Sequence, residues 1–202
     1  MRLIFVRHGQ TLWNKERRVQ GISDIELSDF GKEQAECLSR CLKNEDIGAM
    51  YSSHLKRAKE TAEIIGQFHD VEIEIEEGLC ELNQGDFEGL AFEELMKKHS
   101  EFLRKWAIDP ASMVMPNGES LGELQNRACQ VIEDIAKNRK NAIIVSHNFT
   151  IMTVLCKIQN IDLKNFRRLR VDVASKTVVE FVDGKPALKL LNDTEHLCNL
   201  KC

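Results

Sequence analysis

The strongest constraint on the fold is a set of short apolar segments that alternate with helical patterns. Residues 3–6, 49–52 and 142–145 are rich in apolar side chains and end at polar residues or turns, as buried strands do. Apolar residues at helical spacing follow each of these runs, so strands and helices alternate along most of the chain. This alternation predicts a mainly parallel sheet that is covered by helices on both faces.

Two other segments predict strands at the edges of this sheet. Residues 178–182 and 187–191 flank Asp183-Gly184, which is typical of a β-hairpin. Residues 71–76 alternate apolar side chains with glutamates, as expected for a strand with one wet face near an edge. The predicted fold class is therefore α/β: a three-layer sandwich with a mainly parallel central sheet, helices on both faces and an antiparallel edge hairpin.

Caps and breaks predict where the helices lie. Ser28 is the expected N-cap of the first helix, and Ser120 with Glu123 forms a capping box before a well-defined apolar helical face. Further helices are predicted from Ser53, over residues 92–106 and from about residue 150 to 158, with a loop over residues 108–118.

Composition limits the partners of the protein. The chain has 202 residues and a formal net charge of -4, so we expect one domain over residues 1–202, with no general attraction to nucleic acid or to an anionic membrane. The basic cluster of Arg167, Arg168 and Arg170 is interpreted as a solvent-facing surface. The expected partner is a small molecule, and a homodimer is compatible with the sequence.

Segment lengths and cysteine spacing indicate the compartment. The apolar runs are too short for a membrane span, and the N-terminal run is too short for the core of a signal peptide. The cysteines number seven and include no C-x-x-C pair, which predicts reduced thiols rather than a disulfide framework or a zinc site. These features predict a cytoplasmic protein.

Ionisable side chains follow the predicted strands at the edge where ligands bind such sheets. Arg7 and His8 come directly after the first strand, Arg57 lies near the start of the helix after the second, and His147 follows the third. Ligands of open α/β sheets bind beyond the carboxyl ends of the strands. Each residue alone is weak evidence, but buried positive charge needs a partner. Their joint occurrence predicts a site for an anion.

Motifs around these residues occur in the order typical of one family. Together they resemble the histidine phosphatase superfamily, in its phosphoglycerate-mutase-like branch, and the resemblance covers nearly the whole chain. The motifs are residues 3–11 with Trp13-Asn14, Leu27-Ser28 with Gly31, residues 52–58 with Thr61-Ala62, Glu81 with Gly85 and residues 87–89, Gly118-Glu119-Ser120, Val145-Ser146-His147, and residues 191–194 with 196–197.

The resemblance implies a phosphatase that transfers the phosphoryl group to a histidine before hydrolysis. It assigns His8 as the nucleophile, Glu81 as the general acid and later base, and Arg7, Arg57 and His147 as the phosphate clamp. Phosphoryl transfer depends mainly on positioning and charge stabilisation, for which arginine supplies forked, permanent charge. Because the sequence has no metal-ligand spacing, we expect a metal-independent reaction without a cofactor.

Four further positions are candidate substrate contacts. Asn14, Gln20 and Gly21 fit the loop beside the phosphate pocket of the family. Asn148 stands where the family usually has glycine; asparagine tolerates a positive φ, so the change is expected to affect the pocket mouth more than the clamp. The expected substrate is a small phosphate ester: phosphoserine, α-ribazole phosphate, a sugar phosphate or a phosphoglycerate.

Three other functions fit parts of the sequence. A cofactor-dependent phosphoglycerate mutase would use the same residues, but such mutases are typically longer, so a phosphatase is favoured. A serine hydrolase would use Ser120 in the G-x-S-x-G match at residues 118–122, yet a nucleophile elbow needs a strand directly before the serine. A non-catalytic phospholigand-binding module should have lost His8 or Glu81, and both are present.

Overall fold

Six strands form one sheet at the centre of the computed structural model, which describes residues 1–200. The strand order is β3-β2-β4-β1-β5-β6. The four strands from β3 to β1 run parallel, whereas β5 is antiparallel to both β1 and β6. The strands are β1 (Arg2–Arg7), β2 (Ala49–Ser52), β3 (Ile73–Ile75), β4 (Ala142–Ser146), β5 (Lys176–Val182) and β6 (Lys185–Asp193).

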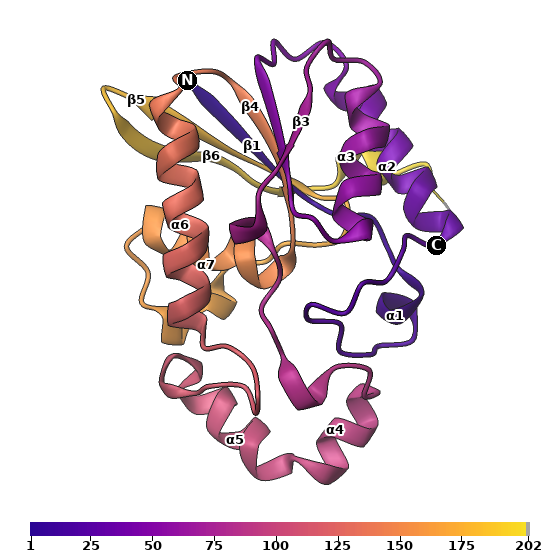
Figure 1. The fold of residues 1–202 in the computed structure, drawn as a ribbon, viewed down its shortest axis with the longest axis vertical. Coiled ribbons are helices and arrows are strands. Elements are labelled where there is room, and N and C mark those ends of the chain that lie inside the picture. The colour runs from indigo at the N-terminus through magenta and orange to yellow at the C-terminus, as the bar shows by residue number, and fades with distance from the viewer. Residues whose placement is uncertain (201–202) are drawn as a thin grey trace.

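Helices cover both faces of the sheet, so the predicted three-layer sandwich is confirmed. Figure 1 shows α2 and α3 on one side of the strands and α6 and α7 on the other. The shorter helices α1, α4 and α5 lie beyond the sheet, at the end to which the carboxyl terminus of β1 points (Figure 1). The helices are α1 (Leu12–Lys15), α2 (Asp29–Leu42), α3 (Lys56–Gly66), α4 (Phe92–Lys98), α5 (Ser100–Ile108), α6 (Leu121–Lys137) and α7 (Asn148–Ile158).

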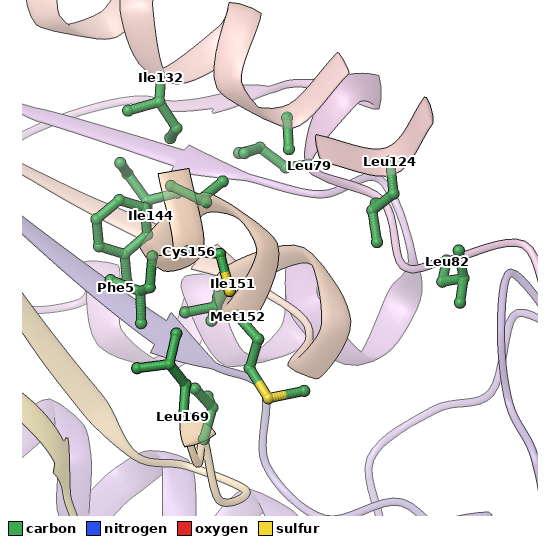
Figure 2. Close-up of a cluster of buried hydrophobic side chains, with 14 of the residues drawn as sticks. Phe5, Leu79, Leu82, Leu124, Ile132, Ile144, Ile151, Met152, Cys156 and Leu169 are labelled. Carbon is green, nitrogen blue, oxygen red and sulfur yellow. The ribbon is translucent and has the colours of Figure 1, made fainter. Parts of the chain in front are cut away.

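Each central strand is buried on both faces, because its alternate side chains enter two separate cores. Ile4 and Val6 of β1 pack with α2 and α3, whereas Leu3 and Phe5 pack with α6 and α7. Figure 2 shows the second core, where side chains of the sheet, α6 and α7 meet near Phe5 and Ile144. Burial on both faces explains why these strands read as continuous apolar runs.

The predicted helix over residues 92–106 is wrong in one respect, because the chain bends at His99 and forms two helices, α4 and α5. The His99 ring packs against Phe87, with ring centroids 4.9 Å apart. Leu95 before the bend and Trp106 after it belong to the same core. Since apolar side chains face that core on both sides of the bend, the sequence spacing does not reveal the break.

Two helices begin a few residues from their predicted starts, and a predicted loop contains a short turn. Helix α3 begins at Lys56 rather than near Ser53, because the Ser53 N–H still bonds the sheet at the carbonyl of Val145. Helix α7 begins at Asn148, two residues earlier than predicted. The predicted loop over residues 108–118 contains a 3-10 turn, η3 (Pro110–Ser112).

The predicted hairpin of β5 and β6 is confirmed. None of the helices within residues 1–200 is long and apolar enough to cross a bilayer.

The capping box of α6 is confirmed and gives a stability prediction. The Ser120 hydroxyl accepts a hydrogen bond from the Glu123 N–H at 3.2 Å, and the Glu123 carboxylate accepts one from the Ser120 N–H at 2.9 Å. We expect Ser120→Ala to lower the free energy of unfolding by about 1 kcal/mol, because an N–H of the first turn loses its partner. Urea denaturation measures this change, and a Ser120→Ala protein as stable as wild type would contradict it.

Candidate active site

Two buried histidines face each other at the carboxyl ends of β1 and β4. His8 follows β1 and His147 follows β4, and these two strands are neighbours in the sheet. Their ring centroids are 5.1 Å apart, and the side chains are 2% and 0% exposed. The parallel pairing of β1 with β4 therefore brings together two residues that are far apart in the sequence, as predicted.

Hydrogen bonds assign the tautomer of His8. Its Nδ1 lies 2.7 Å from the carbonyl oxygen of Gly9, so Nδ1 carries the proton and donates it. The other ring nitrogen, Nε2, then has a free lone pair, and it accepts a hydrogen bond of 3.3 Å from Nε of Arg57. His8 thus presents an uncharged, nucleophilic Nε2 toward a guanidinium.

Arg57 is a fully buried cation held by carbonyl groups. It donates to the carbonyl of Gly21 at 2.7 Å and to that of Ser23 at 2.8 Å. Arg7, at the end of β1, donates to the carbonyl of Val171 at 2.6 Å, and burial lowers its pKa to about 10. Neither arginine forms a salt bridge with the described residues. Both therefore keep a positive charge that an anion can neutralise.

The charge of these arginines acts on the histidines. Burial, followed by the positive charge of Arg57, holds the pKa of both His8 and His147 well below the ordinary value. Both imidazoles are therefore uncharged at neutral pH.

Both ring nitrogens of His147 and Nε of Arg7 are buried and have no hydrogen-bond partner among residues 1–200. Buried polar atoms are normally paired, so these atoms mark a place suited to phosphate oxygens.

The carboxylate of Glu81 lies at the N-terminus of α7. It accepts hydrogen bonds from the N–H groups of Phe149 at 3.2 Å and Thr150 at 3.3 Å, and Glu81 is only 6% exposed. The first N–H groups of a helix have no partner within the helix and favour a negative group. Since α7 begins directly after His147, this contact places the Glu81 carboxylate beside the histidine pair.

Arg127 of α6 holds the chain segment around Glu81. It donates to the carbonyls of Gly78 at 2.9 Å, Cys80 at 2.8 Å and Glu81 at 2.8 Å, and it forms a two-point ion pair with Glu119. Glu119 was predicted only as part of a motif, and Arg127 was not predicted as a site residue. The sequence pattern of an amphipathic helix does not show which of its polar residues will bond the backbone of another segment.

Glu88 connects the two loops of the site and was also missed as a site residue. Its carboxylate accepts hydrogen bonds from the N–H groups of Ile22 at 2.9 Å, Ser23 at 2.8 Å and Gln84 at 3.1 Å. Gly21 has a φ of 52° and lies so close to this carboxylate that a Cβ atom would overlap it. Glu88 therefore shapes the turn whose carbonyls hold Arg57.

The four candidate substrate contacts have different positions. Asn14 and Gln20 both accept hydrogen bonds from Thr11. The Thr11 N–H donates to Oδ1 of Asn14, and the Thr11 hydroxyl donates to Oε1 of Gln20. Asn14 and Gln20 therefore hold the loop around α1 together. Gly21 contributes its carbonyl to Arg57. Asn148 is the first residue of α7 and has no positive φ, so the position does not require the backbone freedom of glycine. It lines a cavity of about 460 Å³ together with Arg7.

Within residues 1–200, no group of three or more His, Cys, Asp or Glu side chains is placed to hold a metal ion.

The family model of the histidine phosphatase superfamily (branch 1) matches residues 3–194. The chain belongs to this superfamily. The predictions of the family, of the α/β fold class and of a phosphatase function are therefore confirmed.

Several relatives of this histidine phosphatase match over most of their length. Phosphoserine phosphatase 1 of Hydrogenobacter thermophilus is 34% identical, over 98% of this chain and 94% of the relative. Phosphoglycerate mutase-like protein 4 of Arabidopsis thaliana is 32% identical, over 96% and 86%. Among solved structures, Bacillus stearothermophilus YhfR has a TM-score of 0.92 at 28% identity, over 97% of this chain and 98% of that chain. Phosphoserine phosphatase of Entamoeba histolytica in complex with 3-phosphoglyceric acid has a TM-score of 0.84 at 30% identity, over 97% and 98%.

The lowered histidine pKa values predict how stability depends on pH. Below pH about 6.5 the unfolded chain binds protons that the folded histidine phosphatase does not, so its free energy of unfolding falls as the pH decreases, by up to about 1.4 kcal/mol per pH unit for each such histidine. We expect His147→Asn to make this fall shallower, because one of these histidines is removed. Urea denaturation from about pH 7.5 to about pH 5 measures both slopes.

The comparison isolates His147. His69 and His196 also have lowered pKa values, and they contribute equally in both proteins. Equal slopes for wild type and His147→Asn would mean that His147 titrates at its ordinary pKa in the folded protein.

Proposed function

We propose that this protein hydrolyses a small phosphate monoester without a metal, by way of a phosphohistidine at Nε2 of His8. The observation that carries the proposal is the tautomer of His8. Its Nδ1–H is fixed on the Gly9 carbonyl, which directs the Nε2 lone pair at the guanidinium of Arg57, a cation without a carboxylate partner among the described residues. An uncharged imidazole in a positive, buried pocket combines a nucleophile with a place for phosphate oxygens.

The first step transfers the phosphoryl group to the enzyme. Nε2 of His8 forms a bond to phosphorus while the bond from phosphorus to the ester oxygen breaks, and the electron pair of that bond stays on the oxygen. Arg7, Arg57 and His147 offer N–H donors to the phosphoryl oxygens. Glu81 acts as the general acid and gives a proton to the leaving oxygen.

The second step returns the nucleophile. The carboxylate of Glu81 takes a proton from a water molecule, whose oxygen attacks phosphorus as the bond to Nε2 breaks. Inorganic phosphate leaves and Glu81 is protonated again. The cycle consumes one water and one ester and needs no ion, because the arginines supply the charge that a metal supplies in other phosphatases.

The site argues against the alternative functions. Ser120 caps α6, and its hydroxyl bonds Glu123 rather than a histidine, so it lacks the base that a serine hydrolase needs. A binding module has no need for both a nucleophilic His8 and a carboxylate at Glu81. Several relatives are named phosphatases, which favours hydrolysis over the mutase reaction.

The substrate class is also part of the proposal. Relatives named phosphoserine phosphatase, one of them solved with 3-phosphoglyceric acid, favour a small phosphorylated metabolite. A cytoplasmic location and a small-molecule partner, rather than nucleic acid or a membrane, belong to the same proposal.

Trapping of the intermediate tests the proposal directly. Brief reaction with a ³²P-labelled phosphomonoester, in the presence of a chelator, should leave acid-labile, base-stable label on the wild-type protein and none on His8→Ala. Steady-state turnover of His8→Ala should fall by at least about a thousandfold, because a covalent route loses its nucleophile. Unchanged turnover of His8→Ala, or loss of wild-type activity on chelation, would exclude the mechanism.

Arg127 offers a test of the role of Glu81. If Arg127 positions the general acid, Arg127→Met should lose at least about tenfold more kcat/KM with phosphoserine than with p-nitrophenyl phosphate, because an alkoxide must be protonated and p-nitrophenolate need not be. Arg127→Lys, which keeps the charge, should lose less. Initial rates on the two esters give the ratio.

Glu81→Gln is the matched control, and it should show the same dependence on the leaving group. A variant that merely destabilises the fold lowers both rates in proportion. Equal losses on both esters in Arg127→Met, with the expected pattern in Glu81→Gln, would leave Glu81 as the acid and remove the role of Arg127.

A further inference from the structure

A cavity of about 460 Å³ opens directly beside the predicted phosphate clamp. Arg7 lines one part of it, and Asn148 and Phe149 of α7 line another. The Phe149 N–H is also a donor to the Glu81 carboxylate. The cavity therefore adjoins both the clamp and the general acid, which is where the leaving group of a phosphate ester must lie.

Aromatic rings form a continuous wall of this cavity. Trp106 of α5, Phe149 of α7 and Phe166 of the 3-10 helix η4 (Leu163–Arg168) all line it. Each ring contacts the other two, with centroid distances of 6.5, 6.3 and 5.6 Å. Rings fixed by mutual packing offer a preformed apolar surface at little cost in conformational entropy. This wall suits the body of a leaving group rather than its charge.

Arg167 places a second positive charge on the same cavity. It donates to the carbonyl of Trp106 at 3.2 Å, and its guanidinium carbon lies 5.0 Å from the ring centroid of Phe166. Arg167 is exposed and forms no salt bridge with the described residues. The other cavity charges, Arg170 and Asp172, neutralise each other through a contact of 2.8 Å. Arg167 is thus a positioned cation that a ligand can reach.

We propose that this cavity binds the leaving group of a phosphomonoester that carries a carboxylate, with Arg167 as the partner of that carboxylate. The inference rests on the proposed function, because it takes the phosphate to lie at Arg7. A carboxylate matches the planar fork of a guanidinium. One arginine balances the single charge of a carboxylate, whereas a second phosphate would bring more charge than the cavity offers.

Because its orientation is fixed, Arg167 is proposed to select a carboxylate at one position rather than to attract anions in general. Stacking on Phe166 and bonding to Trp106 restrict the guanidinium before any ligand arrives, so binding loses little side-chain entropy. Arg168, the next residue, is also exposed but does not line the cavity. The chain therefore supplies a matched control with the same charge on the same element.

Paired substrates test this subsite. We would measure kcat/KM for phenyl phosphate and 4-carboxyphenyl phosphate with wild type, Arg167→Gln, Arg167→Lys and Arg168→Gln. Wild type should have a higher kcat/KM for the carboxylated ester. In Arg167→Gln the ratio of the two kcat/KM values should fall about tenfold, because one charge-assisted contact is removed, and the change should lie in KM. Arg167→Lys should keep part of the preference, and Arg168→Gln all of it. The intrinsic reactivities of the two esters cancel when the preference is compared between variants.

The outcomes are separable from those of the proposed mechanism. A wild type without preference, an unchanged preference in Arg167→Gln, or an equal loss in Arg168→Gln would each overturn the subsite. If His8→Ala still hydrolysed both esters at the wild-type rate, the phosphohistidine mechanism would fail, while the effect of Arg167 on the preference would still be measured. A loss in Arg167→Gln that is equal for both esters would indicate damage to the aromatic wall and would also overturn the assignment.

Discussion

The buried guanidinium of Arg57 is the interaction on which the arrangement of the site depends. Two backbone carbonyls and the lone pair of His8 accept hydrogen bonds from three of its five N–H groups without cancelling its charge. A carboxylate in the same place would neutralise the cation and lower its attraction for phosphate. Burial, followed by this remaining charge, lowers the pKa of both histidines and keeps them uncharged, and the charge keeps the pocket positive. The contact between Arg57 and His8 therefore contributes to both the proposed nucleophile and the proposed anion site.

Carboxylates surround the clamp, but each one near it is tied to backbone or to a cation outside it. Glu88 bonds N–H groups of residues 22, 23 and 84, and Glu81 bonds those at the start of α7. Glu119 pairs with Arg127, which itself holds carbonyls of the segment around Glu81. The acidic residues thus fix the loops, while the arginines at the strand ends face the ligand site. This separation lets an acidic protein keep a positive pocket.

The sequence predicted what depends on periodicity and strand order. Buried strands read as apolar runs, and parallel pairing brings their carboxyl ends together, so His8, Arg57 and His147 could be placed in one site. The roles of Glu88 and Arg127 could not be predicted, because they act through backbone groups whose positions depend on tertiary packing. Asn14 and Gln20 were predicted in the loop beside the phosphate pocket, and that contact stays a prediction. Their hydrogen bonds with Thr11 could not be predicted, since they depend on the folding of a tight loop. The bend at His99 was missed for a similar reason: a tertiary contact with Phe87 leaves the apolar spacing intact.

The residues proposed for phosphoryl transfer depend on strand order, whereas those proposed for substrate choice depend on tertiary packing. His8, Arg7 and His147 lie on or directly after strands of one rigid sheet, so short motifs are enough to define them. The cavity wall comes from α5, η4 and α7, and its shape depends on how Trp106, Phe149 and Phe166 pack together. We expect a change in any one ring to shift the others, and with them the guanidinium of Arg167 that packs over Phe166. Substrate choice can therefore change by substitutions outside the sheet while the proposed phosphoryl-transfer residues stay in place.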